Sequence, residues 1–188
     1  IQGDHVIFEK GDRDFQRVLA PKIEGTRLLD DLLEKEPLDF FCCFSSSSAI
    51  LGDFGSCDYS IGNRFQTAYA RYRDGRESPG KTVVINWPLW RQGGMGFQDD
   101  HLAEMYLKTS GQRFLETEEG LATFDRILSR ESGRHLVLVG HPDRVHRFLG
   151  MIENRATDTD AIKSDHRHIA SPGKGRRPEM KGLTVEQC

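Results

Sequence analysis

The sequence lacks the features that mark membrane-spanning, secreted and nucleic-acid-binding proteins. No apolar run approaches the roughly 18 residues that a transmembrane helix needs. The first residues, Ile1 to His5, show none of the basic and then apolar pattern of a secretory signal peptide. The formal net charge is −3, so no excess of basic residues indicates binding to nucleic acid. We therefore expect neither a membrane nor a nucleic acid as a partner.

Cysteine is scarce, and its spacing fits neither a disulfide framework nor a zinc site. Of the four cysteines, Cys42 and Cys43 are adjacent within an apolar run, whereas Cys57 and Cys188 stand apart. No Cys-x-x-Cys pair is present, and the histidines of the tail have no partner ligands at a metal-binding spacing. We therefore predict no metal site and a reducing, cytoplasmic location.

What the chain does contain is an alternation of helical and strand patterns. Its 188 residues suit one domain. The predicted helices are residues 12–36, 57–73, 100–108 and 117–129, and the predicted strands are the apolar runs 38–44, 82–87 and 135–140. Pro21 should kink or split the first helix. Continuous apolar strands suit burial on both faces, and their alternation with helices predicts an α/β fold with a parallel sheet. Three strands are few for such a sheet, so we expect further strands before residue 1.

Polar residues gather where the first of these strands ends. Ser46 lies at that end, and Tyr59 and Asn63, four residues apart, share one face of the next helix. Ligands bind at the carboxyl ends of strands in open α/β sheets, so a site is expected here. A carbonyl oxygen that gains charge as hydride arrives needs a proton donor, which Tyr59 could be, and a hydrogen-bond donor, which Ser46 could be. The ammonium of Lys22 would favour the ionised phenol, and Asn63 could hold Lys22 or a water beside it.

Each of these residues, taken singly, has an ordinary reading as a turn, a helix face or a solvated side chain, and only their joint spacing indicates a site. The segment Phe44–Phe65, which contains three of them, resembles the active-site segment of ketoreductase domains in modular polyketide synthases, members of the short-chain dehydrogenase/reductase superfamily. Supporting segments, in the same order as in the family, are Val18–Gly25, Asn86–Trp90 followed by Gly93–Gly96, and Glu119–Asp125.

The resemblance covers about residues 1–150. It implies a Rossmann-like three-layer αβα parallel sheet, of which this chain holds the C-terminal part. Residues 151–188 are polar and contain several Pro and Gly residues, so we predict a linker towards a following carrier domain.

The resemblance also implies a role for each candidate residue. Tyr59 would be the proton donor and Ser46 the residue that polarises the carbonyl. Lys22 would bind the nicotinamide ribose and tune Tyr59, and Asn63 would support it. Most short-chain reductases carry lysine at the position of Asn63, and its replacement by Lys22 from the earlier helix is similar to the polyketide ketoreductases. The implied cofactor is NADPH, and the implied substrate is a β-ketoacyl chain on the phosphopantetheine of an acyl carrier protein.

Further residues are expected at the cofactor and the substrate. Trp87 and Pro88 would border the nicotinamide, and we expect Trp87 to belong mostly to the core, with a contact to the cofactor at its edge. The predicted substrate-binding residues are Asp4, Leu51, Gly94, Met95 and Phe97.

Two of these substrate positions bear on stereochemistry. Asp4 resembles the last aspartate of the Leu-Asp-Asp fingerprint of B-type ketoreductases, although the two preceding residues depart from it. Leu51 stands where A-type domains tend to carry Trp. Both positions favour a D-configured hydroxyl product. The wording of Cys57–Phe65 is most similar to the trans-acyltransferase synthases.

The Gly-rich loop with which the family binds nucleotide is missing. The Gly-rich segment Arg91–Gly96 follows a strand but opens no helix, and it lies where the family's substrate-side loop begins. We therefore expect the N-terminal half of the same ketoreductase as a partner of this chain. Two alternatives stay open: a non-catalytic structural half-domain within a megasynthase, and a reductase of free small ketones.

Overall fold

The structure is a computed structural model of the chain, and it describes residues 7–52, 56–76, 78–93 and 100–151. By its internal contacts the chain divides into two compact units, Ile1–Asn154 and Arg155–Cys188. Every described residue belongs to the first unit. The linker predicted for residues 151–188 therefore lies outside the described part, apart from Met151.

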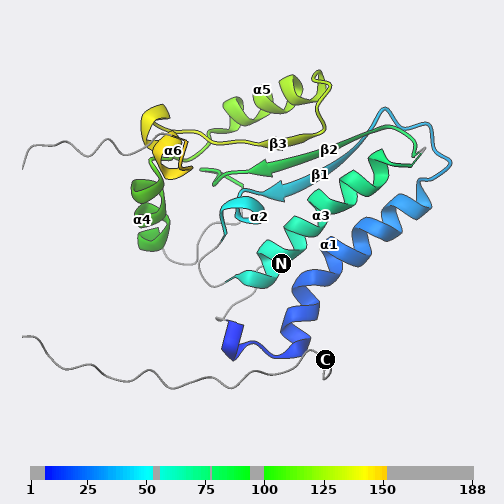
Figure 1. Cartoon of the computed structure of the whole chain (residues 1–188), viewed down its shortest axis with the longest axis horizontal. Coiled ribbons are helices and arrows are strands. Elements are labelled where there is room, and N and C mark those ends of the chain that lie inside the picture. The colour runs from blue at the N-terminus through cyan, green and yellow to red at the C-terminus, as the bar shows by residue number, and fades with distance from the viewer. Residues whose placement is uncertain (1–6, 53–55, 77, 94–99, 152–188) are drawn as a thin grey trace, which may run out of the picture. The chain divides into compact units, whose positions relative to one another are not determined.

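Three parallel strands, β1 (Phe40–Ser46), β2 (Lys81–Trp87) and β3 (Arg134–Leu136), form a sheet in the order β1-β2-β3 (Figure 1). In the β1–β2 register Ser46 pairs with Trp87, so the two strands end together at one edge of the sheet. This confirms the predicted α/β fold with a parallel sheet. The first strand begins two residues later than predicted, and β3 is shorter than predicted.

The burial of the strands differs from the prediction in one respect. β2 is buried at every residue after Lys81, as expected for a central strand. In β1, by contrast, Phe41 and Cys43 are buried, whereas Phe40 and Phe44 are exposed. The predicted burial of this strand on both faces is therefore wrong. The reason is that Phe40, Cys42 and Phe44 lie on the face of β1 towards the α5 side, where the cover is incomplete and Cys42 is only half-buried.

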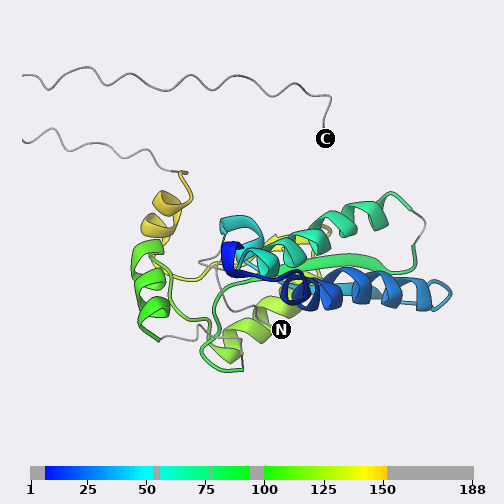
Figure 2. The ribbon, with the colours of Figure 1, turned by 90° about the horizontal axis from the view of Figure 1, so that it is seen from below.

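Helices cover the two faces of the sheet, as Figure 2 shows for α3 (Cys57–Asp74) and α5 (Thr117–Leu128). Ala70 of α3 packs with Phe41, Cys43 and Val84 in one core cluster. Ile127 of α5 belongs to a second cluster on the opposite face, with Val83, Ile85, Trp87, Leu115 and Val137. The described residues thus form three layers, helix, sheet and helix.

The first helix, α1 (Asp12–Leu32), packs along α3. It follows a short 3₁₀ helix, η1 (Ile7–Glu9). Pro21 lies inside α1, and Figure 1 shows that the helix bends without splitting. A proline in a helix interior removes one backbone hydrogen bond and clashes with the preceding turn, which explains the bend. The prediction of a kink is therefore confirmed, and the helix ends four residues earlier than predicted.

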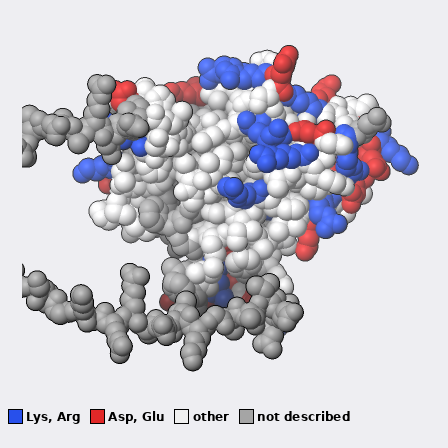
Figure 3. All heavy atoms as spheres, viewed as in Figure 1, with Lys and Arg blue, Asp and Glu red and all other residues white. Residues whose placement is uncertain are grey.

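Three shorter helices complete the described part: α2 (Ser48–Leu51), α4 (Asp100–Ser110) and α6 (Pro142–Phe148). α2 packs on α3 beside the end of β1, and α4 contacts α6. Within the described ranges no helix is both long and apolar enough to span a membrane. Figure 3 shows basic and acidic side chains interspersed over the upper and right parts of the face in view.

Candidate active site

Ser46 is the last residue of β1, at the carboxyl end of the sheet. Its hydroxyl oxygen accepts a hydrogen bond from the backbone N–H of Ser48, at 3.2 Å. The next backbone N–H, that of Ser47, donates to the carbonyl oxygen of Trp87 at 2.8 Å, which ties the turn after β1 to the end of β2. The half-buried Ser46 hydroxyl is therefore held at the strand end by local structure. Within the described ranges its own proton has no acceptor, so it is available for a hydrogen bond to a ligand.

Tyr59 and Asn63 lie on the first two turns of α3. The Asn63 side-chain N–H donates to the backbone carbonyl of Tyr59 at 2.9 Å. The Asn63 carbonyl in turn accepts from the Ser45 hydroxyl at 3.3 Å, which fixes this turn against β1. Asn63 is fully buried, and its side-chain Oδ1 has no hydrogen-bond partner within the described residues. An unpaired buried acceptor indicates a missing donor at this point.

Lys22 reaches from α1 to the end of β1. Its ammonium donates to the carbonyl oxygen of Phe44 at 2.8 Å and to Oε1 of Gln66 at 3.2 Å. Gln66 is itself held by a 3.3 Å hydrogen bond to the hydroxyl of Thr26. Burial lowers the pKa of Lys22 from its ordinary value of 10.5, against an opposing effect of Cys43.

We expected from the sequence that Asn63 could hold Lys22 or a water beside it, and in the structure the Lys22 ammonium donates to Gln66. Gln66 lies three residues after Asn63 and is buried on α3. Gln66 lies seven residues after Tyr59, so helical spacing could have placed it on the same face of α3. A glutamine by itself, however, does not indicate a contact with lysine. Across the described ranges no hydrogen bond joins Lys22 to Tyr59 or to Asn63. The catalytic roles of these residues stay predictions.

Lys22 can pass so close to α3 because Gly62 has no side chain. A Cβ atom at Gly62 would lie 3.1 Å from Cβ and 3.2 Å from Cγ of Lys22. Such contacts are tighter than normal packing allows without a shift of the neighbour. The glycine therefore sets the spacing between α1 and α3 at the site.

The predicted cofactor and substrate residues are only partly described. Trp87 is buried, and its ring lies 5.7 Å from that of Phe44 and 5.0 Å from that of Trp90. It therefore belongs to the core at the end of β2, and Pro88 follows it in a buried position. Leu51 is half-buried at the end of α2. The other predicted substrate residues, Asp4, Gly94, Met95 and Phe97, lie outside the described residues.

An ion pair beside Tyr59 was not predicted from the sequence. The ammonium of Lys10 lies 2.5 Å from Oδ2 of Asp58, and both side chains are almost completely buried. Sequence reasoning missed it because nothing in the spacing of two residues 48 positions apart indicates a contact.

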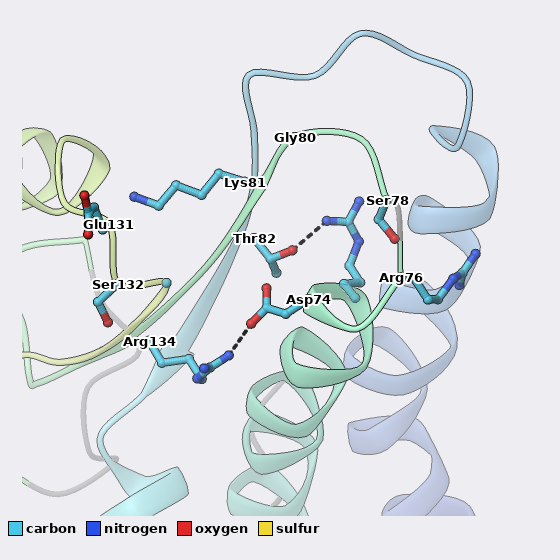
Figure 4. Close-up of a pocket in the computed structure, with 11 residues that line it drawn as sticks. Asp74, Arg76, Ser78, Gly80, Lys81, Thr82, Glu131, Ser132 and Arg134 are labelled. Atoms are coloured by element: carbon cyan, nitrogen blue, oxygen red, sulfur yellow. Dashed lines mark hydrogen bonds and ion pairs between the residues drawn. The ribbon is translucent and has the colours of Figure 1, made fainter.

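The described residues also line a cavity of about 410 Å³ at the opposite end of the sheet (Figure 4). Its walls come from the end of α3, the start of β2 and the loop before β3. Arg73 and Arg134 lie in it, and each already has an acidic partner, Asp30 at 2.6 Å and Asp74 respectively. The cavity contains none of the predicted catalytic residues, so we place the candidate active site at the carboxyl end of β1.

The parallel sheet lies between helical layers, with Ser46 and the Lys22 ammonium at the end of β1 and Tyr59 on the first turn of the following α3. This arrangement defines a Rossmann-like fold of the short-chain dehydrogenase/reductase type. The family model of the KR domain matches residues 1–92. The chain is 58% identical over 153 residues to polyketide synthase PksM of Bacillus subtilis (strain 168). It is 44% identical over 151 residues to polyketide synthase ThaG of Burkholderia thailandensis. The chain belongs to the ketoreductase domains of polyketide synthases.

Solved structures agree with this family and show how much of it the chain spans. A ketoreductase from the macrolactin assembly line matches with a TM-score of 0.71 and 37% identity, over 79% of this chain and 28% of that one. A ketoreductase domain from the bacillaene assembly line matches with a TM-score of 0.72 and 35% identity, over 78% and 36%. The matches to PksM and ThaG cover 81% and 78% of this chain but 4% and 3% of those proteins. The chain therefore spans a small part of the synthases and about a third of the solved ketoreductase chains.

Proposed function

We propose that this chain is the catalytic, substrate-facing part of a ketoreductase that reduces a β-ketoacyl thioester to the β-hydroxyacyl thioester. The observation that carries the proposal is the arrangement at the end of β1. There the Ser46 hydroxyl, the Lys22 ammonium and the first turns of α3 with Tyr59 are each fixed by contacts to that strand or to their own turn.

In the proposed reaction the residues of this chain handle the oxygen of the ketone. Ser46 donates a hydrogen bond to the carbonyl oxygen and so stabilises the charge that develops on it. As hydride adds to the β-carbon, the π electrons of the C=O bond move to oxygen. Tyr59 transfers its phenolic proton to this oxygen and later regains a proton from solvent. The positive charge of Lys22 stabilises the transient phenolate.

The residues present fit a nicotinamide cofactor, which supplies the hydride. Lys22 uses two of its three N–H donors on Phe44 and Gln66, so one remains for a ribose hydroxyl. The unpaired Oδ1 of Asn63 is an acceptor that a hydroxyl or a water could satisfy. Trp87 and Pro88 would border the nicotinamide from the end of β2. We propose NADPH as the form used.

The family relationship supports a carrier-bound substrate, because the matched relatives PksM and ThaG are polyketide synthases. We propose a β-ketoacyl chain on the phosphopantetheine of an acyl carrier protein, within a trans-acyltransferase synthase and in the cytoplasm. The positions of Asp4 and Leu51 support a D-configured hydroxyl, which chiral chromatography of the product would test. We propose Gly94, Met95 and Phe97 as further substrate-binding residues.

The N-terminal half of the ketoreductase is the second proposed partner, and β1 is where it would join. Among the described strands β1 pairs only with β2, so its other edge has no strand partner (Figure 1). Phe44 on this strand is 54% exposed. A further strand at this edge would pair the backbone, cover the ring and bring the nucleotide-binding loop of the fold to the carboxyl end of the sheet.

Tyr59→Phe in a complete ketoreductase domain that contains this chain tests the proposed chemistry. We expect kcat for NADPH-dependent reduction of a β-ketoacyl thioester to fall by roughly 10²- to 10⁴-fold, the usual contribution of a proton donor. Tyr72→Phe is the matched control, because Tyr72 is an exposed tyrosine on the same helix. Equal activity of Tyr59→Phe and the wild type would overturn the assignment.

Cofactor binding separates the proposal from its alternatives. We expect tight NADPH binding by the complete domain and none by these 188 residues alone. Tight binding by the isolated chain would contradict the proposed N-terminal partner. A complete domain that binds NADPH but reduces no thioester would indicate a structural half-domain. Preference for free small ketones over the thioester would indicate a reductase of free small ketones.

A further inference from the structure

The first turn of α3 is held by a buried ion pair that reaches back to the segment before α1. The ammonium of Lys10 lies 2.5 Å from Oδ2 of Asp58, with 1% and 0% of the two side chains exposed. The other carboxylate oxygen, Oδ1, accepts a hydrogen bond from the backbone N–H of Tyr59 at 2.9 Å. Both oxygens of one buried carboxylate are therefore engaged, one by a distant lysine and one by the residue that carries the proposed proton donor.

Stability alone gives a poor explanation for such a pair. Two charges lose their hydration on burial, and a well-packed apolar pair of the same size often serves a fold as well or better. A buried ion pair does, however, demand a particular geometry, because each group needs its partner at a fixed place. The pair between Lys10 and Asp58 is thus suited to fix position.

A second buried pair at the other end of the same helix provides the comparison. Arg73 lies 2.6 Å from Asp30 of α1, with 0% and 5% of the side chains exposed. This pair also joins α3 to an upstream segment, but it lies four turns away from Tyr59 and beside the cavity at the opposite end of the sheet. The two pairs are alike in burial and chemistry and differ in their distance from the candidate active site.

We propose that Lys10 and Asp58 form a positioning pair that sets the orientation of Tyr59 for proton transfer. Asp58 links the two parts of this arrangement, since one of its carboxylate oxygens accepts from the backbone N–H of Tyr59 and the other from the Lys10 ammonium. The pair fixes the first turn of α3 to the segment that leads into α1, the helix that also supplies Lys22. The pair thereby fixes the position of Tyr59 relative to Lys22. This inference rests on the role proposed for Tyr59.

The test compares both pairs in a complete ketoreductase domain that contains this chain. We expect Lys10→Met and Asp58→Asn to lower kcat by roughly tenfold to hundredfold, the effect of a misplaced catalytic group, with KM for NADPH unchanged. Lys10→Arg keeps the charge and should recover most of kcat. Arg73→Met and Asp30→Asn should lower the melting temperature but leave kcat within about twofold of the wild type, because they lie far from the reacting atoms.

The double variant Lys10→Met with Asp58→Asn guards against loss of folding, because it buries no unpaired charge and keeps an acceptor for the N–H of Tyr59. We expect it to recover melting temperature relative to the single variants but not kcat. Wild-type kcat in this folded double variant would overturn the positioning role. Equal kcat losses in the Lys10 or Asp58 variants and in the Arg73 or Asp30 variants would overturn it too. Full activity of Tyr59→Phe would instead overturn the proposed function, so the two failures are distinguishable.

Discussion

The Lys22 ammonium lies half-buried among α1, β1 and α3, where two neutral oxygens accept its hydrogen bonds. On the same side of β1, Cys43 is buried beneath α3. Burial acts on the two groups in opposite directions on the pKa scale, because it disfavours the charged form of each. It lowers the pKa of Lys22 and raises that of Cys43 to about 11. The thiol therefore stays neutral at physiological pH and gives the lysine no anionic partner.

Because the pKa of Lys22 is lowered in the folded protein, the free energy of unfolding should vary with pH in the alkaline range. Between the folded-state and unfolded-state pKa values the unfolded chain binds more protons, so stability rises with pH in that window. We expect the free energy of unfolding of the wild type to increase relative to Lys22→Met as the pH approaches 10.5. Urea unfolding of both proteins at a series of pH values measures this difference. Parallel pH curves would contradict it.

The raised pKa values of Cys42 and Cys43 predict slow reaction with alkylating reagents. At pH 8 a thiol with a pKa of about 11 instead of the ordinary 9.0 is ionised roughly a hundredfold less, and the thiolate is the reactive form. We expect the native protein to be alkylated at both positions at least that much more slowly than the urea-unfolded protein. Peptide mass spectrometry over time gives both rates, and similar native and unfolded rates would show that burial does not protect these thiols.

At the scale of elements, α3 brings most of the site together. Its first turns carry Tyr59 and Asn63, and its middle carries Gln66. The close approach of α1 and α3 at Gly62 lets the lysine cross from one helix to the strand beside the other. The site therefore depends on helix spacing as much as on the catalytic side chains.

Gly62→Ala should disturb this spacing. The new methyl group would lie 3.1 Å from Cβ of Lys22, so we expect a loss of about 1–3 kcal/mol in the free energy of unfolding, as for other overpacked sites, together with a reduced kcat. Gly25→Ala in α1 is the matched control. Its nearest neighbour would be 3.8 Å away, so it should stabilise the helix by about 0.5–1 kcal/mol. Calorimetry and steady-state kinetics on both variants test the difference, and similar effects would argue against the close approach.

The sequence predicted the three strands and the four longer helices in their order, because strand and helix periodicity are local properties. The short helices α2 and α6 were not predicted, since one or two turns are too short to show a helical period. The parallel sheet and the residues at the end of β1 followed from this periodicity and from the family resemblance. The exposure of Phe40 and Phe44 could not be predicted, since an apolar run does not show which of its faces a helix will cover. The contacts of Lys22 with Gln66 and of Lys10 with Asp58 join residues 44 and 48 positions apart, and no local pattern encodes such pairs.

At the scale of the whole molecule, the most informative surface of the described part is β1. Phe40 and Phe44 are 42% and 54% exposed on it, beside a strand edge that pairs with no described strand. Exposed apolar side chains next to an open strand edge favour pairing with another segment. In the proposed function that segment is the N-terminal half of the ketoreductase, and the solved ketoreductases are about three times as long as the part that this chain matches.

Phe40→Thr tests whether β1 is covered in the complete domain. Threonine keeps the strand propensity but removes the ring, so we expect the complete domain to lose about 1–2 kcal/mol of unfolding free energy if another strand buries Phe40. Leu121→Gln, at an exposed apolar residue of α5, is the control and should change the unfolding free energy by less than about 0.5 kcal/mol. In the isolated chain Phe40 is exposed on β1 and can contact a second copy of the chain. The same Phe40→Thr change should therefore reduce self-association in sedimentation experiments. An unchanged unfolding free energy of the complete domain would mean that β1 remains an exposed edge, and the proposed N-terminal partner would have to join elsewhere.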